Sequence, residues 1–330
     1  MKVFQIDIKS YTDFFQSQLN APNIYAHPSW FYGMSKQPTV LGCYDDRQQL
    51  LAVWPFNMVK RSFGVKCLSQ PIFCQSLGPL FAENISENRS YHSSHSLYRK
   101  IIKSFFNHIR NSGYQCISQG LPANFDMSQY FNHHGICLNY RITYQIPSDR
   151  NEKEAWEKMH TDHRRKIRST LDRFELTADC KPGELWDLKK ESLQPRQLST
   201  LPAKSQFVEA VTSMMEQQNA CILGVRDVDN NWKSMAFFGE DVSALYYLVG
   251  YTEKNTGGDS TSLTVLWEGI KRALKAGKNF DFEGTMVANL DRNFRRFGPK
   301  AIPYARLEWD RSLTGHLKAA FKKWNAAKKQ

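Results

Sequence analysis

The sequence lacks a long apolar run, paired cysteines and a secretion signal. No window approaches the roughly 20 apolar residues that a membrane-spanning helix requires. The seven cysteines stand singly, without a C-x-x-C pair or zinc-finger spacing to histidine. Residues 1–10 contain no continuous apolar stretch, so we expect no signal peptide. These absences predict a cytoplasmic protein with buried thiols and no metal site.

Four motifs of common enzyme classes are also missing. The chain has no G-x-G-x-x-G after a strand, no G-x-x-x-x-G-K-S/T loop, no H-E-x-x-H and no G-x-S-x-G. Rossmann-type hydride transfer, P-loop nucleotide hydrolysis, zinc proteolysis and elbow-type serine hydrolysis therefore lose most of their support.

The composition instead favours two globular cores and an anionic partner. A chain of 330 residues with 41% hydrophobic and 13% aromatic residues can fill two domains. Its 44 basic and 32 acidic side chains give a formal net charge of +12. This charge raises the local concentration of anions and carries no information about the fold.

The pattern of apolar residues predicts the same order of elements twice. In the first half we expect a hairpin, a long helix, a strand, a short helix and a strand, at 40–44 with 50–57, 96–110, 114–119, 126–132 and 136–146. In the second half we expect a three-strand meander, a helix, a strand, a short basic helix and a strand, at 221–226, 234–240, 244–251, 260–276, 279–283, 289–297 and 303–309.

Glycine spacing supports a duplication. The long helix ends at Gly113 with Gly120 seven residues on, and the second helix ends at Gly277 with Gly284 seven residues on. We therefore predict domains at 1–149 and 150–310. The second begins with a charged helical stretch that breaks near residues 161–162. A basic amphipathic helix is expected at 311–330.

A glycine loop precedes the helix at 260–276. Residues 255–260 read Asn-Thr-Gly-Gly-Asp-Ser, and the unpaired amides of a helix start can bind an anion. The alternative is a solvent loop in which Asp259 or Ser260 caps the helix, and Asp259 would repel a phosphate.

Two carboxylates follow on the next strand. Because side chains alternate along a strand, Asp281 and Glu283 share one face while Phe280 and Phe282 fill the other. Such a pair beside Gly284 suits a general base or an amine-binding site. The alternative is that a carboxylate pairs with a neighbouring arginine or caps the following helix.

Basic residues gather on two predicted helices. One group includes Arg165 and Arg168, and the other includes Arg292 and Arg296. Each group is either a solvated face with its own acidic partners or a site for a phosphate-bearing substrate.

A family resemblance rests on the second half. Phe280-Asp-Phe-Glu-Gly-Thr-Met286 and Phe294-Arg-Arg-Phe-Gly298 resemble the C-terminal part of FemAB-like proteins, within the GCN5-related N-acetyltransferase (GNAT) superfamily. His163-Arg-Arg-x-Ile-Arg168 resembles the basic segment that opens the second half of such proteins. The resemblance implies an α/β (α+β) fold of tandem GNAT-like domains, each a mixed, mainly antiparallel sheet flanked by helices.

The resemblance also implies acyl or aminoacyl transfer to an amine, on a cell-envelope or polysaccharide precursor. The first domain would shape the acceptor cleft and the second would hold the catalytic site. Glu283 or Asp281 would take the proton from the amine. The donor would be acyl-coenzyme A (acyl-CoA) or aminoacyl-tRNA, and its expected contacts are Tyr251, Thr256, Gly257, Gly258 and Ser260. Candidates for holding an acidic donor or acceptor are Arg165, Arg168, Arg292 and Arg296.

The donor loop departs from the pattern of CoA users, because it lacks their Q/R-x-x-G-x-G/A spacing. Two further functions stay open. The net charge and aromatic content fit a nucleic-acid-binding protein. The basic stretch 311–330 fits a non-catalytic adaptor, or a peripheral enzyme, on an anionic membrane surface.

Overall fold

The structure is a computed structural model that describes residues 1–18, 23–85, 87, 89–123, 125–193, 201–253 and 260–312. The predicted helix at 311–330 lies outside the described residues from position 313 onward, and so does the loop that contains Thr256, Gly257 and Gly258. We call residues 1–149 the first half and residues 150–312 the second half.

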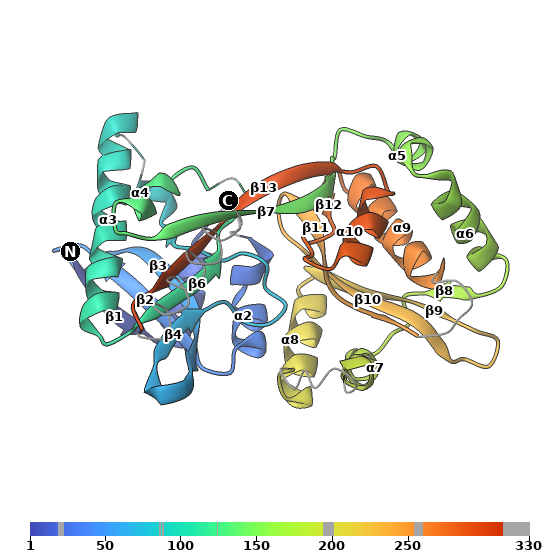
Figure 1. Cartoon of the computed structure of the whole chain (residues 1–330), viewed down its shortest axis with the longest axis horizontal. Helices are drawn as coiled ribbons and strands as arrows, with labels where there is room; N and C mark the ends of the chain where they lie inside the picture. The colour runs from blue at the N-terminus through green and yellow to red at the C-terminus, as the bar shows by residue number, and fades with distance from the viewer. Residues whose placement is uncertain are drawn as a thin grey trace, which may run out of the picture.

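The strands of both halves form one sheet, and helices from each half pack beside it (Figure 1). The first half forms β1 (Lys2–Ile6), α1 (Ile8–Gln16), η1 (Ile24–Ala26), α2 (Pro28–Met34), β2 (Pro38–Tyr44), β3 (Leu50–Lys60), η2 (Ser62–Gly64), β4 (Lys66–Ser69), β5 (Leu80–Phe81), η3 (Glu83–Ile85), α3 (Tyr91–Asn111), β6 (Cys116–Gly120), α4 (Gln129–Asn132) and β7 (Cys137–Ile146). The second forms α5 (Glu152–Lys158), α6 (Thr161–Leu171), β8 (Glu175–Thr177), α7 (Pro182–Leu193), α8 (Lys204–Glu216), β9 (Ala220–Arg226), β10 (Trp232–Glu240), β11 (Ala244–Thr252), α9 (Ser260–Lys275), β12 (Asn279–Asp281), α10 (Ala288–Arg295) and β13 (Lys300–Asp310).

The strand order is symmetric about the middle of the sheet. It runs β1-β2-β3-β4-β6-β13-β7-β12-β11-β10-β9-β8, with β5 paired to β3. The last strand of each half therefore lies in the other half, β13 beside β6 and β7 beside β12. This order confirms the predicted duplication and the mixed, mainly antiparallel sheet. The boundary near residue 149 stays a prediction, because β7 and β13 cross between the halves.

Local sequence explains most of the elements. Helix α9 buries its apolar stripe, Leu263, Leu266, Trp267 and Ile270, and the chain turns at Gly277 with φ 67°. The predicted break before α6 is confirmed, although His160 caps the helix in place of Thr161 or Asp162. The predicted strand at 279–283 is too long, since β12 ends at Asp281.

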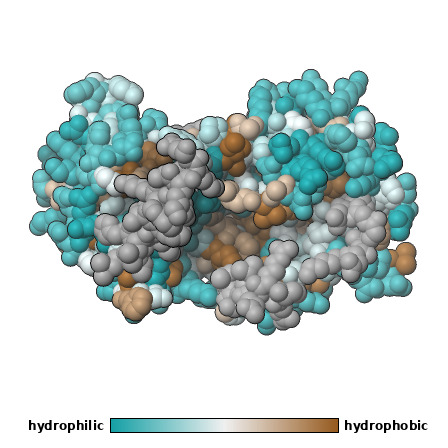
Figure 2. Space-filling model, viewed as in Figure 1, coloured by the Kyte–Doolittle hydropathy of each residue, from teal (hydrophilic) through white to brown (hydrophobic). Residues whose placement is uncertain are grey.

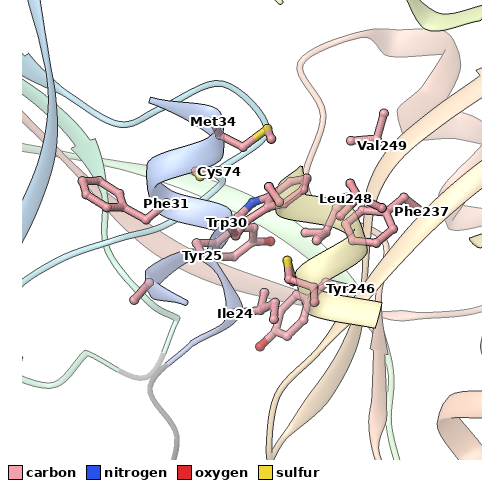
Figure 3. Close-up of a cluster of buried hydrophobic side chains, with 14 of the residues drawn as sticks. Ile24, Tyr25, Trp30, Phe31, Met34, Cys74, Phe237, Tyr246, Leu248 and Val249 are labelled. Carbon is pink, nitrogen blue, oxygen red and sulfur yellow. The ribbon is translucent and has the colours of Figure 1, made fainter. Parts of the chain in front are cut away.

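The largest core joins the two halves. Trp30 of α2 packs against Phe237 of β10 with ring centroids 5.2 Å apart, and Tyr25 packs against Tyr246 at 5.5 Å. Figure 3 shows these side chains together with Leu248 of β11. A cluster around Trp54 lies mainly in the first half and takes Leu307 from β13, and a cluster around Trp267 lies mainly in the second half and takes Ile146 from β7. The shared core fixes how the halves sit against each other.

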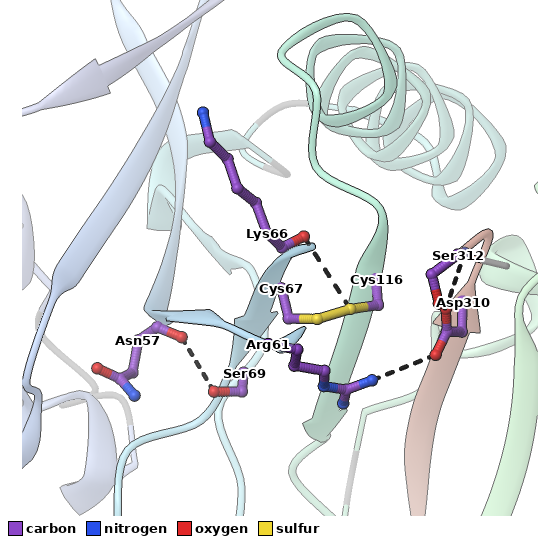
Figure 4. The surroundings of a disulfide bond; sticks show 8 residues. All are labelled: Asn57, Arg61, Lys66, Cys67, Ser69, Cys116, Asp310 and Ser312. Carbon is purple, nitrogen blue, oxygen red and sulfur yellow. Dashed lines mark hydrogen bonds and ion pairs between the residues drawn. A yellow bond between two sulfur atoms is a disulfide. The ribbon is translucent and has the colours of Figure 1, made fainter. Parts of the chain in front are cut away.

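The expectation of free thiols throughout is wrong at one place. Cys67 of β4 and Cys116 of β6 form a disulfide, because the parallel pairing of these strands sets the two residues opposite each other (Figure 4). The two cysteines are 49 residues apart in the sequence, so no local motif could predict that they pair. Cys43, Cys74 and Cys180 are buried free thiols, as expected. Within the described residues, every helix is too short or too polar to span a lipid bilayer.

The disulfide should stabilise the first half measurably. We expect the double variant Cys67→Ala/Cys116→Ala to lose about 2–4 kcal/mol of unfolding free energy, since the bond restricts the unfolded chain. Denaturant unfolding with and without dithiothreitol measures the loss. Cys137→Ala, which removes an exposed free thiol, is the control and should keep the sensitivity to reductant. Equal stability of the double variant and the parent would contradict a bond that forms in solution.

Candidate active site at the junction of the halves

Two parallel strands part at the centre of the second half. β11 and β12 pair only from Ala244 opposite Asn279 to Tyr246 opposite Asp281. β12 ends there, while β11 continues to Thr252. The backbone that follows β12 is therefore free to turn away from the sheet beside the middle of β11, and Glu283 lies on this segment.

β11 is irregular at the same level. Phe237 of β10 faces Val249 and Phe238 faces Tyr247, so Leu248 is an extra residue in the ladder. A bulge of this kind leaves the extra residue out of the regular pairing and can redirect its backbone groups. The bulge therefore puts an unpaired backbone position next to the point where the strands part.

Asp281 is buried, with 2% of its surface exposed, and all its oxygens are matched. Oδ1 accepts hydrogen bonds from Thr143 Oγ1 at 2.5 Å and from the Glu283 backbone N–H at 2.8 Å. Oδ2 accepts from Gln145 Nε2 at 2.7 Å. Burial raises the pKa of this carboxyl, and the bonds from Thr143 and Gln145 counteract the shift. Asp281 thus connects the segment that contains Glu283 to β7 of the first half by hydrogen bonds.

Glu283 has the opposite surroundings. Its φ of 54° lies in the left-handed region, where a residue with a side chain is strained. Among the described residues, its buried Oε1 has no hydrogen-bond partner. Burial raises the pKa of Glu283 well above the ordinary 4.5; the nearby Tyr25 hydroxyl opposes this shift, and the charge of Asp281 adds to it. The carboxyl is therefore a much stronger base than a solvated one.

Phenol side chains surround Glu283. The Tyr25 hydroxyl, from the first half, is buried without a hydrogen bond among the described residues, and it lies close enough to Glu283 for each group to shift the pKa of the other. Burial raises the pKa of Tyr247 to about 12, and the charge of Glu283 contributes. Burial likewise raises the pKa of the Cys74 thiol. Among the described residues, these neighbours contribute hydroxyl and thiol groups and no cation.

A cavity of about 260 Å³ lies between the halves, next to this cluster. Figure 2 shows the molecule hollowed between the halves, with apolar side chains in the hollow. The cavity is lined by Asn23, Gln75, Ser76, Leu121, Pro122, Ala123, Thr143, Gln145, Asp241, Val242, Ser243, Tyr246, Asn279, Asp281, Ile302 and Tyr304. Both halves contribute, and most polar lining groups are amides and hydroxyls.

The matching position of the first half has no free acid. Gln119 precedes Gly120 as Glu283 precedes Gly284. Its Oε1 accepts from Trp54 Nε1 at 2.7 Å, and its Nε2 donates to the Pro55 carbonyl at 2.8 Å. The side chain is fully buried and fully matched. Gln119 is thus a structural residue, in contrast to Glu283.

The four predicted substrate-binding arginines lie on α6 and α10. Arg165 and Arg296 both form ion pairs with Asp162, with nitrogen–oxygen distances of 2.8 and 3.7 Å. Arg168 lies over the Trp156 ring at 5.4 Å, and Arg292 donates to Asn289 Oδ1 at 2.8 Å. Each therefore has a protein partner, and none lines the cavity. Their role in substrate binding stays a prediction.

The predicted donor contacts are described only at the two ends of their loop. Tyr251 lies in β11 and is half-buried, and Ser260 begins α9. Within the described part of the chain, no group of three or more His, Cys, Asp or Glu could hold a metal ion. Sequence reasoning missed Tyr25, Gln75, Thr143 and Gln145, because these residues approach the site from the first half and carry no motif.

Comparison with solved structures gives the fold. FemX superposes with a TM-score of 0.63 at 13% identity, over 92% of this chain and 97% of that chain. L-PGS from Bacillus licheniformis superposes with a TM-score of 0.58 at 11% identity, over 96% of this chain and 97% of that chain. A tandem GNAT protein from the clavulanic acid biosynthesis pathway superposes with a TM-score of 0.51 at 6% identity, over 94% of this chain and 98% of that chain. The chain thus has a FemAB-like, tandem GNAT-type fold. Neither protein-family models nor curated proteins gave a match to the sequence.

The buried carboxyl of Glu283 should make stability fall as the pH rises. Above about pH 4.5 the unfolded chain releases this proton, while the folded protein keeps it until its raised pKa is reached. The free energy of unfolding therefore falls as the pH rises from about 4.5 to the raised pKa of Glu283. We expect Glu283→Gln to match the parent near pH 4 and to become the more stable protein toward neutral pH.

Thermal melting from pH 4 to pH 8 measures this difference. Glu209→Gln, an exposed change on α8, serves as the matched control and should follow the parent at every pH. Melting curves of Glu283→Gln that run parallel to the parent would show that the folded-state pKa is not raised.

Proposed function

We propose that the protein is an acyltransferase that moves an acyl or aminoacyl group to an amine, with Glu283 as the general base. The observation that carries the proposal is the buried Glu283 carboxyl beside the parting of β11 and β12, whose Oε1 has no hydrogen-bond partner among the described residues. Strained, desolvated acids are typical of catalytic sites. The FemAB-like fold supports the reaction class.

The reaction requires no covalent enzyme intermediate. The amine nitrogen bonds to the acyl carbon, and the bond from that carbon to the sulfur or oxygen of the donor breaks. Glu283 takes the proton that the amine loses, directly or through water, and the leaving group gains a proton from Glu283 or from solvent. The backbone N–H at the Leu248 bulge is the candidate donor to the carbonyl oxygen as negative charge develops there.

Asp281 has a different part in this proposal. Both its oxygens accept hydrogen bonds from the protein, from Thr143, Gln145 and the Glu283 backbone N–H. It acts as a positioning residue that holds Glu283 in its strained conformation. The two carboxylates predicted as alternative bases therefore divide into one base and one support.

We take acyl-CoA as the donor and an amine on a cell-envelope or polysaccharide precursor as the acceptor. The start of α9 at Ser260 supports a phosphate-bearing donor, because the dipole of a helix favours an anion at its N-terminus. Tyr251, Thr256, Gly257 and Gly258 would complete its contacts. The acceptor would enter from the cavity between the halves.

Substitution of the proposed base is the direct test. We expect Glu283→Gln to lower kcat by about 10²–10⁴-fold, since it removes proton transfer and keeps the shape. The parent should lose activity as the pH falls through the raised pKa of Glu283. The residual activity of the variant should not show this decrease at low pH. Glu209→Gln should keep full turnover. Full activity of a folded Glu283→Gln enzyme would remove Glu283 from the mechanism.

The donor can be identified by binding. We expect acetyl-CoA at 100 times its Kd to add about 2.7 kcal/mol of stability in a thermal-shift measurement. Free CoA tests the nucleotide part alone. Stabilisation by charged tRNA, with none by acetyl-CoA, would reassign the donor to aminoacyl-tRNA and leave Glu283 as base.

A further inference from the structure

The β7–β13 pair continues beyond the cavity toward two arginines. In this antiparallel register Ile302 faces Thr143, and Tyr304 faces Arg141. Residues two apart on a strand point to the same face and lie about 7 Å apart. Ile302, Tyr304 and Arg306 therefore follow one another on the face that lines the cavity, with Arg141 beside Tyr304.

Arg306 is held in place with one donor unused. Its Nη2 donates to Ser118 Oγ at 2.7 Å, and its Nη1 lies 3.5 Å from Gln70 Oε1. Its Nε is buried and makes no hydrogen bond among the described residues, although Glu308 Oε1 lies 3.6 Å away. The side chain is only 15% exposed. A buried guanidinium donor without a hydrogen bond is costly, so an added acceptor oxygen would stabilise it.

Arg141 places a second positive charge at the same point. Burial lowers the pKa of Arg306, and the Arg141 guanidinium adds to the shift while Glu308 opposes it. Glu308 is shared, because it also accepts from Asn139 Nδ2 at 2.8 Å. Arg141 and Arg306 thus bring two positive charges to this part of the sheet, where Glu308 is the ion-pair partner of Arg306.

A second unmatched donor lies on the cavity side. Gln75 Nε2 is buried without a partner among the described residues, and a Cβ atom on Gly284 would lie 3.1 Å from it. The cavity itself contains Asp241 and Asp281 and no Lys or Arg. Acidic groups therefore lie inside the cavity and basic groups lie at its edge.

Tyr304 connects the two regions. Burial raises the pKa of its hydroxyl, the Arg141 guanidinium counteracts the shift, and the Glu283 carboxylate adds to it. Tyr304 is thus within electrostatic reach of both the arginines and Glu283.

We propose that Arg141 and Arg306 form an anion subsite that binds a phosphate or carboxylate group of the acceptor, while the amine of the same molecule lies at Glu283. This inference rests on the proposed function and narrows it to acceptors that carry an anionic group. The fork of Arg306 donors suits the tetrahedral oxygens of phosphate. The acidic cavity favours the amine end.

Binding of simple anions tests the subsite without any turnover. We expect calorimetry at constant ionic strength to detect binding of inorganic phosphate, and Arg306→Gln and Arg141→Gln each to weaken it roughly 10-fold or more. Arg99→Gln, an equal charge change at an exposed position of α3, should bind as the parent does. Acetate in place of phosphate distinguishes a carboxylate site from a phosphate site. Phosphate binding that is absent, or unchanged in both variants, would overturn the subsite.

A matched pair of acceptors tests the link to catalysis. We expect glucosamine 6-phosphate to exceed glucosamine roughly 10-fold in kcat/KM, and Arg306→Gln to remove this preference through KM while kcat stays near the parent value. Arg141→Gln, on the neighbouring strand, repeats the test if Arg306→Gln melts early. Arginine-dependent phosphate binding with no transfer from any donor would refute the proposed function and keep the subsite. Transfer that is indifferent to the phosphate would refute the subsite and keep the function.

Discussion

The hydrogen bonds from Thr143 and Gln145 to Asp281 are the contacts on which the candidate site depends. They connect β7 of the first half to β12 of the second, and Asp281 in turn accepts the backbone N–H of Glu283. This chain of bonds keeps Glu283 in a left-handed conformation that it would otherwise leave. The exchange of the last strands between the halves is thus part of the site as well as of the fold.

Charge is separated along the junction in a way that suits proton transfer. Among the described residues, Glu283 has phenols and a thiol as neighbours and no cation, so burial can raise its pKa. An arginine at hydrogen-bond distance would stabilise the carboxylate and weaken it as a base. Arg141 and Arg306 lie beyond Tyr304, where they can attract an anion without a direct ion pair to Glu283.

Sequence reasoning succeeded where the signal is local. The apolar stripe of α9, the turn at Gly277 and the break before α6 follow from spacing and capping within a few residues. It failed at the end of β12, because the positive φ of Glu283 stops the strand two residues early. It also missed the Cys67–Cys116 disulfide, which depends on the pairing of β4 with β6.

The sequence by itself determined the repeated order of elements and the two neighbouring carboxyls at the end of β12, but the alternation that would set Asp281 and Glu283 on one face fails, because the strand ends at Asp281. Only the tertiary structure decided which carboxyl is matched and which is left unpaired. The reason is that desolvation depends on whatever packs against a group, and here the deciding neighbours, Tyr25 and Thr143, come from the other half of the chain. Thr143 is 138 residues away from Asp281. Periodicity describes the faces of an element, and it carries no information about a contact over that separation.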